Sequence, residues 1–214
     1  MTVVKICGLR SLPEARVAVQ SGANLLGFIF WKPGKRYIAP VDAARIISTL
    51  RSESLSWSAV GVFVDPTPEE VRAAADVCGL DYVQLSGNES PEVVRAMPRP
   101  TFKALHVRPG DEAVAARAVA SNHYGAERYL LDTHTESLPG GTGVAFRWEA
   151  LREVGQRCLV AGGLRPGNVA SALATLAPYG VDVSSGVEFP SGGKDPALIR
   201  AFLEAVRTHD NRAN

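Results

Sequence analysis

Two side chains with acid–base chemistry stand at the ends of short apolar runs. The first run ends in Lys5, Ile6 and Cys7, and alternation along a strand places Lys5 and Cys7 on the same face. A nearby ammonium group favours the thiolate form of a cysteine, which is the better base or nucleophile. The alternative is a small buried thiol that only fills the end of a strand. The residues alone favour this simpler interpretation of Cys7.

A carboxylate stands at the end of a later apolar run, where Asp132 follows Leu130 and Leu131. Burial beside apolar surface favours the protonated form of a carboxyl group, which can then donate a proton. The alternative is a turn or helix-capping aspartate, and both interpretations stand open for Asp132.

Basic residues and glycines provide candidate binding groups for an anion. The loop at 31–37 holds Lys32, Lys35 and Arg36, and an arginine can bind a carboxylate with two hydrogen bonds. Solvated loop cations are the alternative, more so for the lysines than for Arg36. Glycines let a backbone approach a ligand, and free N–H groups at a helix start bind phosphate. Two later runs end in such residues, which are Gly162, Gly163, Ser184, Ser185 and Gly186.

The elements that must position these groups alternate along the chain. Predicted strands, mostly solid apolar runs typical of parallel strands buried on both faces, cover residues 3–7, 25–30, 59–64, 82–85, 102–107, 128–132, 158–161 and 181–184. Stretches of helical period lie between them, and the sixth, around 146–154, is the weakest. Several of these helices are expected to have a proline near their first turn. These prolines are Pro13, Pro68, Pro91, Pro166 and Pro196.

Eight strand–helix pairs in 214 residues predict one α/β domain, a (β/α)8 TIM barrel over residues 1–214. An open doubly wound sheet is the less favoured alternative. In a barrel the chemistry lies at the carboxyl ends of the strands. That rule selects Cys7, Asp132 and the glycine-rich loops after the seventh and eighth strands, where phosphate binding is favoured over plain turns.

Composition excludes several classes of function. A formal charge of +1, with basic residues spread along the chain, gives no nucleic-acid footprint. No signal peptide and no apolar run of about 20 residues is seen, so we expect a cytoplasmic protein that does not bind membranes. The histidines do not pair with cysteines at metal-ligand spacing. Cys78, on a helical core face, and Cys158, inside a strand, are expected to be structural.

Motifs across nearly the whole chain resemble the phosphoribosylanthranilate isomerase family of tryptophan biosynthesis. They are KICGL at 5–9, GFIF at 27–30, VGVFVD at 60–65, VQLSG at 83–87, LLD at 130–132, GGTG at 140–143, AGGL at 161–164 and DVSSGVE at 182–188. KICGL, GGTG and DVSSGVE together are a specific combination. GGTG is not a dinucleotide-binding fingerprint, and it is a candidate mobile lid.

The resemblance implies an Amadori rearrangement of N-(5-phosphoribosyl)anthranilate, in which an aminoaldose becomes an aminoketose without a metal or organic cofactor. Cys7 matches the general base and Asp132 the general acid. Arg36 matches the contact to the anthranilate carboxylate, and the phosphate loops match Gly162, Gly163, Ser184, Ser185 and Gly186. Asp182 is expected to face the pocket, either touching substrate or orienting a loop. The family leaves both a monomer and a homodimer open.

Two positions depart from the family pattern. Ser86 stands where the fourth-strand motif has histidine, and Gly34 and Lys35 replace the serine and proline before Arg36. We expect a changed neighbourhood at Ser86 without lost activity, and a more flexible loop at Arg36. The alternatives are the aminoaldose isomerase of histidine biosynthesis, which should have aspartate in place of Cys7, and a non-catalytic sugar-phosphate-binding protein.

Overall fold

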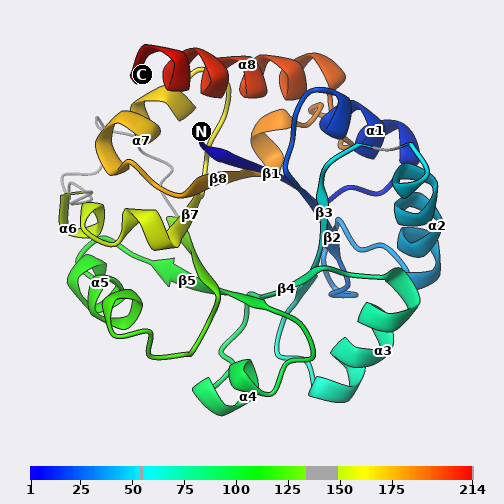
Figure 1. Ribbon diagram of the computed structural model, residues 1–214, viewed down its shortest axis with the longest axis horizontal. Helices are drawn as coiled ribbons and strands as arrows, with labels where there is room; N and C mark the ends of the chain where they lie inside the picture. Colours follow the sequence, from blue (N-terminus) through cyan, green and yellow to red (C-terminus); the bar gives the residue numbers. More distant parts are fainter. Residues whose placement is uncertain (54, 134–148, 214) are drawn as a thin grey trace.

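The apolar runs form the parallel strands of a closed barrel (Figure 1). The computed structural model describes residues 1–53, 55–133 and 149–213. The strands, in order around the ring, are β1 (Val3–Cys7), β2 (Leu25–Ile29), β3 (Ser58–Phe63), β4 (Tyr82–Leu85), β5 (Thr101–Val107), β6 (Arg128–Thr133), β7 (Cys158–Ala161) and β8 (Gly180–Val183). Each strand pairs in parallel with its neighbours in sequence, and β8 pairs with β1. The predicted barrel is confirmed, and the open sheet is wrong.

Helices surround the ring, as Figure 1 shows. They are α1 (Leu12–Gln20), α2 (Pro40–Arg51), α3 (Pro68–Cys78), α4 (Pro91–Arg95), α5 (Glu112–Ala120), α6 (Glu149–Arg152), α7 (Val169–Leu176) and α8 (Pro196–Ala213), with short 3-10 turns η1 (Gly155–Arg157) and η2 (Ser185–Val187). The predicted sixth helix, around residues 146–154, starts at residues that lie outside the described part. Within the described part, this range contains α6.

Local sequence signals fix several helix starts. Ser11 and Glu14 form a reciprocal capping box at α1, and Thr67 and Glu70 form another at α3. Proline occupies the first turn of α1, α3 and α4 and begins α8, as predicted. Pro166 is the exception, because it lies in a turn and α7 begins only at Val169, after Asn168.

Two apolar clusters divide the core at the wall of the barrel. The larger cluster packs the outer faces of the strands against the helices. The smaller one fills the barrel with Leu25, Val60, Phe102, Ala104, Leu130, Leu159 and Ala161. Inward positions therefore alternate with outward ones along each strand. Closer to the carboxyl ends, Cys7, Gln84, His106, Asp132 and Asp182 are inward positions, so polar side chains make up much of the lining of the mouth.

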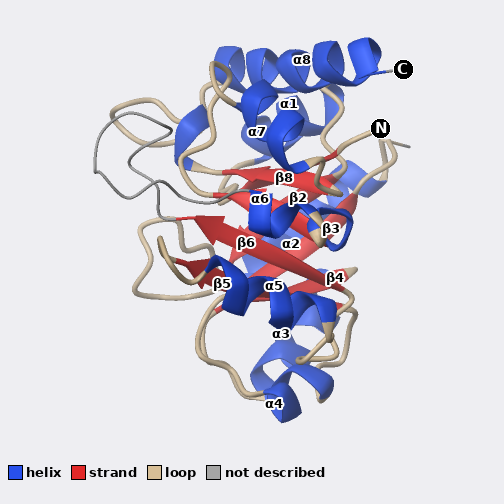
Figure 2. Cartoon of the chain, turned by 90° about the vertical axis from the view of Figure 1, so that its left-hand side faces the viewer, coloured by secondary structure: helices blue, strands red, loops and turns tan. Residues whose placement is uncertain are grey.

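All carboxyl ends of the strands meet at one end of the barrel, since every pairing is parallel. Figure 2 shows the arrowheads of β5 and β6 at the same side. The register sets Lys5 of β1 opposite Asp182 of β8, and His106 of β5 opposite Asp132 of β6. Side chains from strands far apart in sequence are thereby brought to one rim. No helix in the described part of the chain is both long and apolar enough to cross a membrane.

Candidate active site at the carboxyl end of the barrel

Cys7 lies at the last residue of β1, pointing into the barrel mouth beside Gly27 of β2. A Cβ atom on Gly27 would lie 2.8 Å from the Cys7 Sγ atom and 3.1 Å from the Lys5 Nζ atom. Real Cβ contacts are longer than this, so a side chain at position 27 would displace the thiol or the ammonium group. Glycine at this position provides the space that both groups occupy.

Lys5 lies beneath the thiol, as the alternation predicted, and it is fully buried. Its Nζ atom donates to the Asp182 Oδ1 atom over 3.0 Å, which forms a buried ion pair across the β1–β8 seam. Burial alone would lower the pKa of Lys5, but the Asp182 carboxylate and the Cys7 sulfur together raise it above its ordinary value. Burial raises the pKa of Asp182 against the opposing pull of Lys5.

The electrostatics of Cys7 differ from the expectation. Burial raises the pKa of the Cys7 thiol, Lys5 lowers it, and Asp182 raises it, with a net shift upward. The ammonium group favours the thiolate as predicted, but its charge is shared with Asp182, which the sequence did not pair with Lys5. Burial and the Asp182 charge therefore outweigh the pull of Lys5 on the pKa of Cys7.

Asp132 lies near the carboxyl end of β6, in register with His106 of β5 and Ala161 of β7. Its side chain is 28% exposed, which leaves it accessible from the mouth. The His106 Nδ1 atom is 3.4 Å from the Asp132 Oδ2 atom, and the His106 Nε2 atom is 3.0 Å from the Ser86 carbonyl oxygen. Sequence reasoning considered His106 only as a metal ligand. The signal that identifies it is its inward place one strand from Asp132.

Ser86, the departure from the family pattern, follows β4 directly. Its hydroxyl accepts a hydrogen bond from the Gln84 Nε2 atom over 3.0 Å, and its carbonyl oxygen faces the imidazole of His106. The neighbourhood at this position thus contains an imidazole that comes from the adjacent strand.

Arg36 lies over the end of β1, where a Cβ atom on Gly8 would come within 2.5 Å of the Arg36 Cδ atom. Its Nε and Nη2 atoms donate to the two carboxylate oxygens of Glu188 over 2.6 and 2.8 Å. The residue thus binds a carboxylate in the two-pronged way expected, although that carboxylate is a side chain of the protein. Lys32 and Lys35 are exposed, which agrees with the solvated-loop interpretation.

Lys194 is a buried cation that sequence reasoning missed. Its Nζ atom donates to the Ser184 carbonyl and hydroxyl oxygens over 3.0 and 3.2 Å, and to the Glu188 Oε1 atom over 2.8 Å. Burial opposes ionisation of Glu188, but Arg36 and Lys194 lower its pKa to about 2. A lysine after Gly192 and Gly193, close behind the DVSSGVE motif, was the available signal.

The loops after β7 and β8 pack directly on each other. A Cβ atom on Gly186 would lie only 1.8 Å from the Leu164 carbonyl oxygen, so glycine is required for this approach. Gly162 and Gly163 have φ angles of 96° and 62°, which side chains rarely adopt. Gly163 and Ser185 are exposed, so both loops have residues that are open to solvent.

A hydrogen bond joins the second of these loops to the candidate base. The Ser184 hydroxyl donates to the Cys7 carbonyl oxygen over 3.0 Å. The structure therefore brings the predicted phosphate residues, Asp182 and Cys7 to one side of the mouth, with Arg36 held there through Glu188. Asp132 lies on β6, separated from β1 by β7 and β8 in ring order.

Other predicted features lie away from this mouth or outside the described residues. Cys78 and Cys158 are buried; the Cys78 Sγ atom lies 3.1 Å from the Pro40 carbonyl oxygen, and burial raises the pKa of Cys158 to about 12. Both are structural, as predicted. Residues 140–143, the candidate lid, fall outside the described part. Within the described ranges no group of three or more His, Cys, Asp or Glu side chains forms a metal site.

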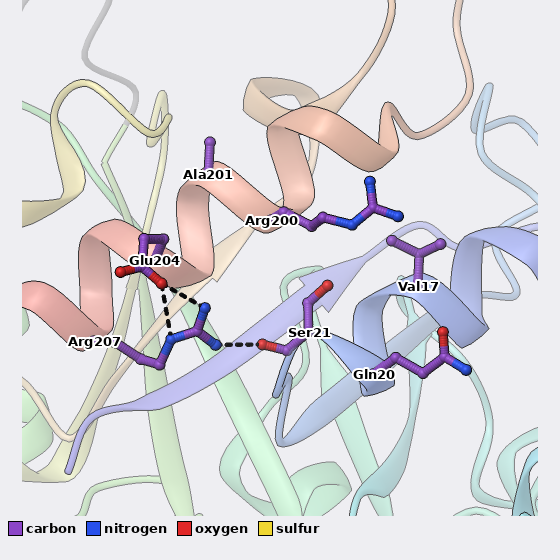
Figure 3. A pocket seen from close by; sticks show the side chains of 7 residues that line it. All are labelled: Val17, Gln20, Ser21, Arg200, Ala201, Glu204 and Arg207. Atoms are coloured by element: carbon purple, nitrogen blue, oxygen red, sulfur yellow. Dashed lines mark hydrogen bonds and ion pairs between the residues drawn. The ribbon is translucent and has the colours of Figure 1, made fainter.

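A separate hollow lies between α1 and α8 (Figure 3). Arg207 crosses it and donates to the Glu204 carboxylate over 2.7 Å and to the Ser21 carbonyl oxygen over 2.8 Å. Ser21 follows the carboxyl end of α1, and helices of a barrel run opposite to its strands. The hollow therefore lies at the end of the barrel away from Cys7. Its charged side chains hydrogen-bond to each other and to the backbone, which indicates a structural contact between α1 and α8.

Comparison with known proteins decides the family. The model of the N-(5′-phosphoribosyl)anthranilate isomerase family matches residues 4–205. The chain belongs to this family. A relative from Citrifermentans bemidjiense, named N-(5′-phosphoribosyl)anthranilate isomerase, is 47% identical over 209 residues, which are 97% of this chain and 98% of the relative. The resemblance inferred from the motifs is confirmed.

Solved structures of the family share the fold. One shows monomers of the dimeric phosphoribosylanthranilate isomerase from Thermotoga maritima, with a TM-score of 0.82, 37% identity, and coverage of 97% of this chain and 100% of that one. Another shows the family enzyme with reduced 1-(o-carboxyphenylamino)-1-deoxyribulose 5-phosphate, with a TM-score of 0.80, 36% identity and the same coverage. A family member thus binds a small phosphorylated ligand on this scaffold.

Proposed function

We propose that this isomerase converts N-(5′-phosphoribosyl)anthranilate to 1-(o-carboxyphenylamino)-1-deoxyribulose 5-phosphate, with Asp132 as general acid and Cys7 as general base. The observation that carries the assignment is the arrangement of the mouth. Cys7 on β1 and Asp132 on β6 flank the two glycine-rich loops that follow β7 and β8. A phosphate held by those loops would place the attached sugar between the acid and the base.

The steps follow from these positions. Asp132 donates a proton to the ribose ring oxygen, the bond from that oxygen to C1 breaks, and the nitrogen lone pair forms an iminium ion at C1. Cys7, once ionised, takes the proton from C2, and the C2–H electron pair forms the enolamine. Tautomerisation of the enolamine gives the aminoketose. Both proton transfers are general acid–base steps, which need a donor and an acceptor on different atoms of the sugar.

Binding roles are assigned to the groups around this pair. Gly162, Gly163, Ser184, Ser185 and Gly186 would bind the phosphate through backbone N–H groups and hydroxyls. Arg36 would bind the anthranilate carboxylate, exchanging its contact with Glu188 or adding to it.

Asp182 stays a proposed member of the site with an orienting role, since its contact with Lys5 and its 8% exposure leave little surface for substrate. No cofactor is part of the proposal.

The decisive experiment combines two substitutions with rate measurements on the purified protein. Cys7→Ala and Asp132→Asn should each lower kcat by about 100-fold or more while substrate still binds. Cys78→Ala is the matched control, because Cys78 is also a buried thiol but lies on α3, away from the mouth. Near-normal turnover in Cys7→Ala or Asp132→Asn would refute the role of that residue.

Complementation of a tryptophan auxotroph separates this function from the alternatives. The unaltered chain should restore growth, whereas a sugar-phosphate-binding protein without activity would not. Failure to complement despite soluble expression would favour that alternative. The aminoaldose isomerase of histidine biosynthesis is tested by turnover of its own substrate, which the proposal expects to be much slower.

We also infer a cytoplasmic enzyme whose residues 1–214 form one domain, present as a monomer or a homodimer. The biosynthetic role of the family and the continuous ring of strands support the first two statements. Sedimentation at several protein concentrations distinguishes the monomer from the homodimer.

A further inference from the structure

His106 occupies a position at the rim of the mouth that neither the motifs nor the acid–base pair explains. It is an inward residue of β5, directly in register with Asp132. Its ring bridges two groups: the Nε2 atom is 3.0 Å from the Ser86 carbonyl oxygen, and the Nδ1 atom is 3.4 Å from the Asp132 Oδ2 atom. Its side chain is 52% exposed, so one edge of the ring meets solvent.

The carbonyl contact determines which nitrogen carries a proton. A carbonyl oxygen can only accept a hydrogen bond, so the Nε2 atom of His106 must be the donor to Ser86. The Nδ1 atom of the neutral ring is then a lone pair directed at a carboxyl oxygen. Such a contact is favourable only when one proton lies between the two atoms, on the ring or on Asp132.

We propose that His106 is a positioning residue that shares one proton with Asp132 and reloads it from solvent after each donation. In one form the ring is cationic and Asp132 is a carboxylate; in the other the ring is neutral and Asp132 is the acid. Donation of the proton to the ring oxygen leaves a neutral ring and a carboxylate, and a proton from water then restores the pair through the exposed ring. This inference rests on the assignment of Asp132 as general acid.

The other charges near His106 do not replace this pairing. The hydrogen bond to Asp132 raises the pKa of His106, burial opposes it, and Lys103 lowers it slightly. Lys103 itself is buried against Glu89, with 2.8 Å between its Nζ atom and the Glu89 Oε2 atom. His106 and Asp111 both line a surface hollow beside β5 and α5, and Asp111 is exposed there. Asp132 is thus the charged group that contacts the ring.

The test measures kcat and KM from pH 5.5 to 9 for four proteins and a control. They are the unaltered enzyme, His106→Gln, Asp132→Asn, the double variant and His123→Gln. His106→Gln keeps a side-chain donor for the Ser86 carbonyl but cannot exchange a proton with Asp132. We expect kcat to fall about 10- to 100-fold with KM within about twofold. The alkaline inflection of kcat should move to lower pH, because the imidazole with its raised pKa no longer holds the shared proton.

The double variant tests whether His106 acts through Asp132. It should be no slower than Asp132→Asn within about twofold, since the positioning role ends with the group it positions. A loss of the full His106→Gln factor in the Asp132→Asn background would overturn the inference. So would an unshifted pH profile in His106→Gln. His123 is exposed and its ring packs edge-on against Tyr124, so His123→Gln should match the unaltered enzyme.

A nitrogen NMR titration of His106 provides a readout besides turnover. We expect a proton on Nε2 throughout, and titration at lower pH in Asp132→Asn, where the carboxylate is gone. If Asp132→Asn is inactive and the His106 titration is unmoved, this inference fails and the proposed function stands. If Asp132→Asn keeps near-normal turnover, the acid assignment itself fails.

Discussion

Asp182→Asn tests the buried charge pair that lies beneath the candidate base. Asparagine keeps the size of the side chain and one oxygen that can accept from Lys5, but it removes the negative charge. Lys5 is fully buried and the two groups are 3.0 Å apart, so the variant leaves an ammonium group inside the barrel opposite a neutral amide. The structure thus allows the loss of charge to be separated from the loss of shape.

Removing one partner of a buried pair costs about 3–5 kcal/mol, and the retained oxygen places this variant near the lower end, at about 3 kcal/mol. In a domain of this size, 1 kcal/mol lowers the melting temperature by about 2–4 °C, so we expect a decrease of about 6–12 °C. Replacing both members, as in Lys5→Met with Asp182→Leu, should recover most of that loss because no charge stays buried.

The pH dependence has a definite sign. Asp182→Asn removes the largest contribution that raises the pKa of Lys5, so burial, which is the largest contribution of all, should then lower that pKa in the folded state below its ordinary value of 10.5. The unfolded chain then binds more protons than the folded one, so stability rises with pH. The deficit of Asp182→Asn relative to the unaltered protein should be largest near neutral pH and should shrink as pH approaches about 10.

Urea unfolding at pH 6, 7.5 and 9 measures this deficit. Absorbance of the thiolate near 240 nm measures the second effect, since Asp182 contributes to the raised pKa of Cys7 and its removal should allow ionisation at lower pH. A deficit below about 1 kcal/mol at all three pH values would refute the claim that the Asp182 charge balances a buried ammonium group.

Three further changes test the packing and charges of the mouth. Gly27→Ala should displace the Cys7 thiol, which should cost about 1–3 kcal/mol of stability and lower kcat more than it raises KM. Unfolding and rate measurements check this, and an unchanged kcat would contradict the close contact. Gly186→Ala should separate its loop from Leu164 and raise KM through weaker phosphate binding, which inorganic phosphate inhibition checks; equal inhibition in both proteins would argue against it. Glu188→Gln should be less stable than the unaltered protein above pH 4.5, where the pKa of about 2 keeps the carboxylate ionised, and the difference in acid unfolding should vanish toward pH 2; a difference independent of pH would count against the ion pairs.

The fold was predictable because its signals are local and repeated. Each strand is a short apolar run, and the predicted bounds agree with the observed ones to within about one residue. The turn before α7 was mispredicted, because Pro166 is equally suited to a turn and to a first helical turn. The side chain of Asn168 donates to the Gly163 carbonyl oxygen across the turn that precedes α7. This contact, which identifies the turn, is seen only in the folded chain.

The positions of the site residues were predictable, but their charge states were not. The barrel rule and the motifs brought Cys7, Asp132 and the glycine loops to one mouth. The partner of Lys5 lies 177 residues away on β8, and no local pattern pairs the two. His106 was missed for the same reason, because its register with Asp132 exists only in the folded chain. The partners of Lys194, Ser184 and Glu188, lie only 10 and 6 residues away, but the turn that folds the lysine back onto them could not be predicted.

The seam between β1 and β8 also determines when the site comes into existence during folding. Lys5 and Asp182, like Ser184 and Cys7, are separated by 177 residues, so both contacts form only when the last strand meets the first. Contacts of such long range form late, since the ends of the chain must first be brought together. A chain with β1 through β7 in place still lacks the counter-charge for Lys5 and the hydroxyl that holds Cys7. Appearance of activity during refolding therefore reports ring closure itself, and should follow helix formation measured by circular dichroism.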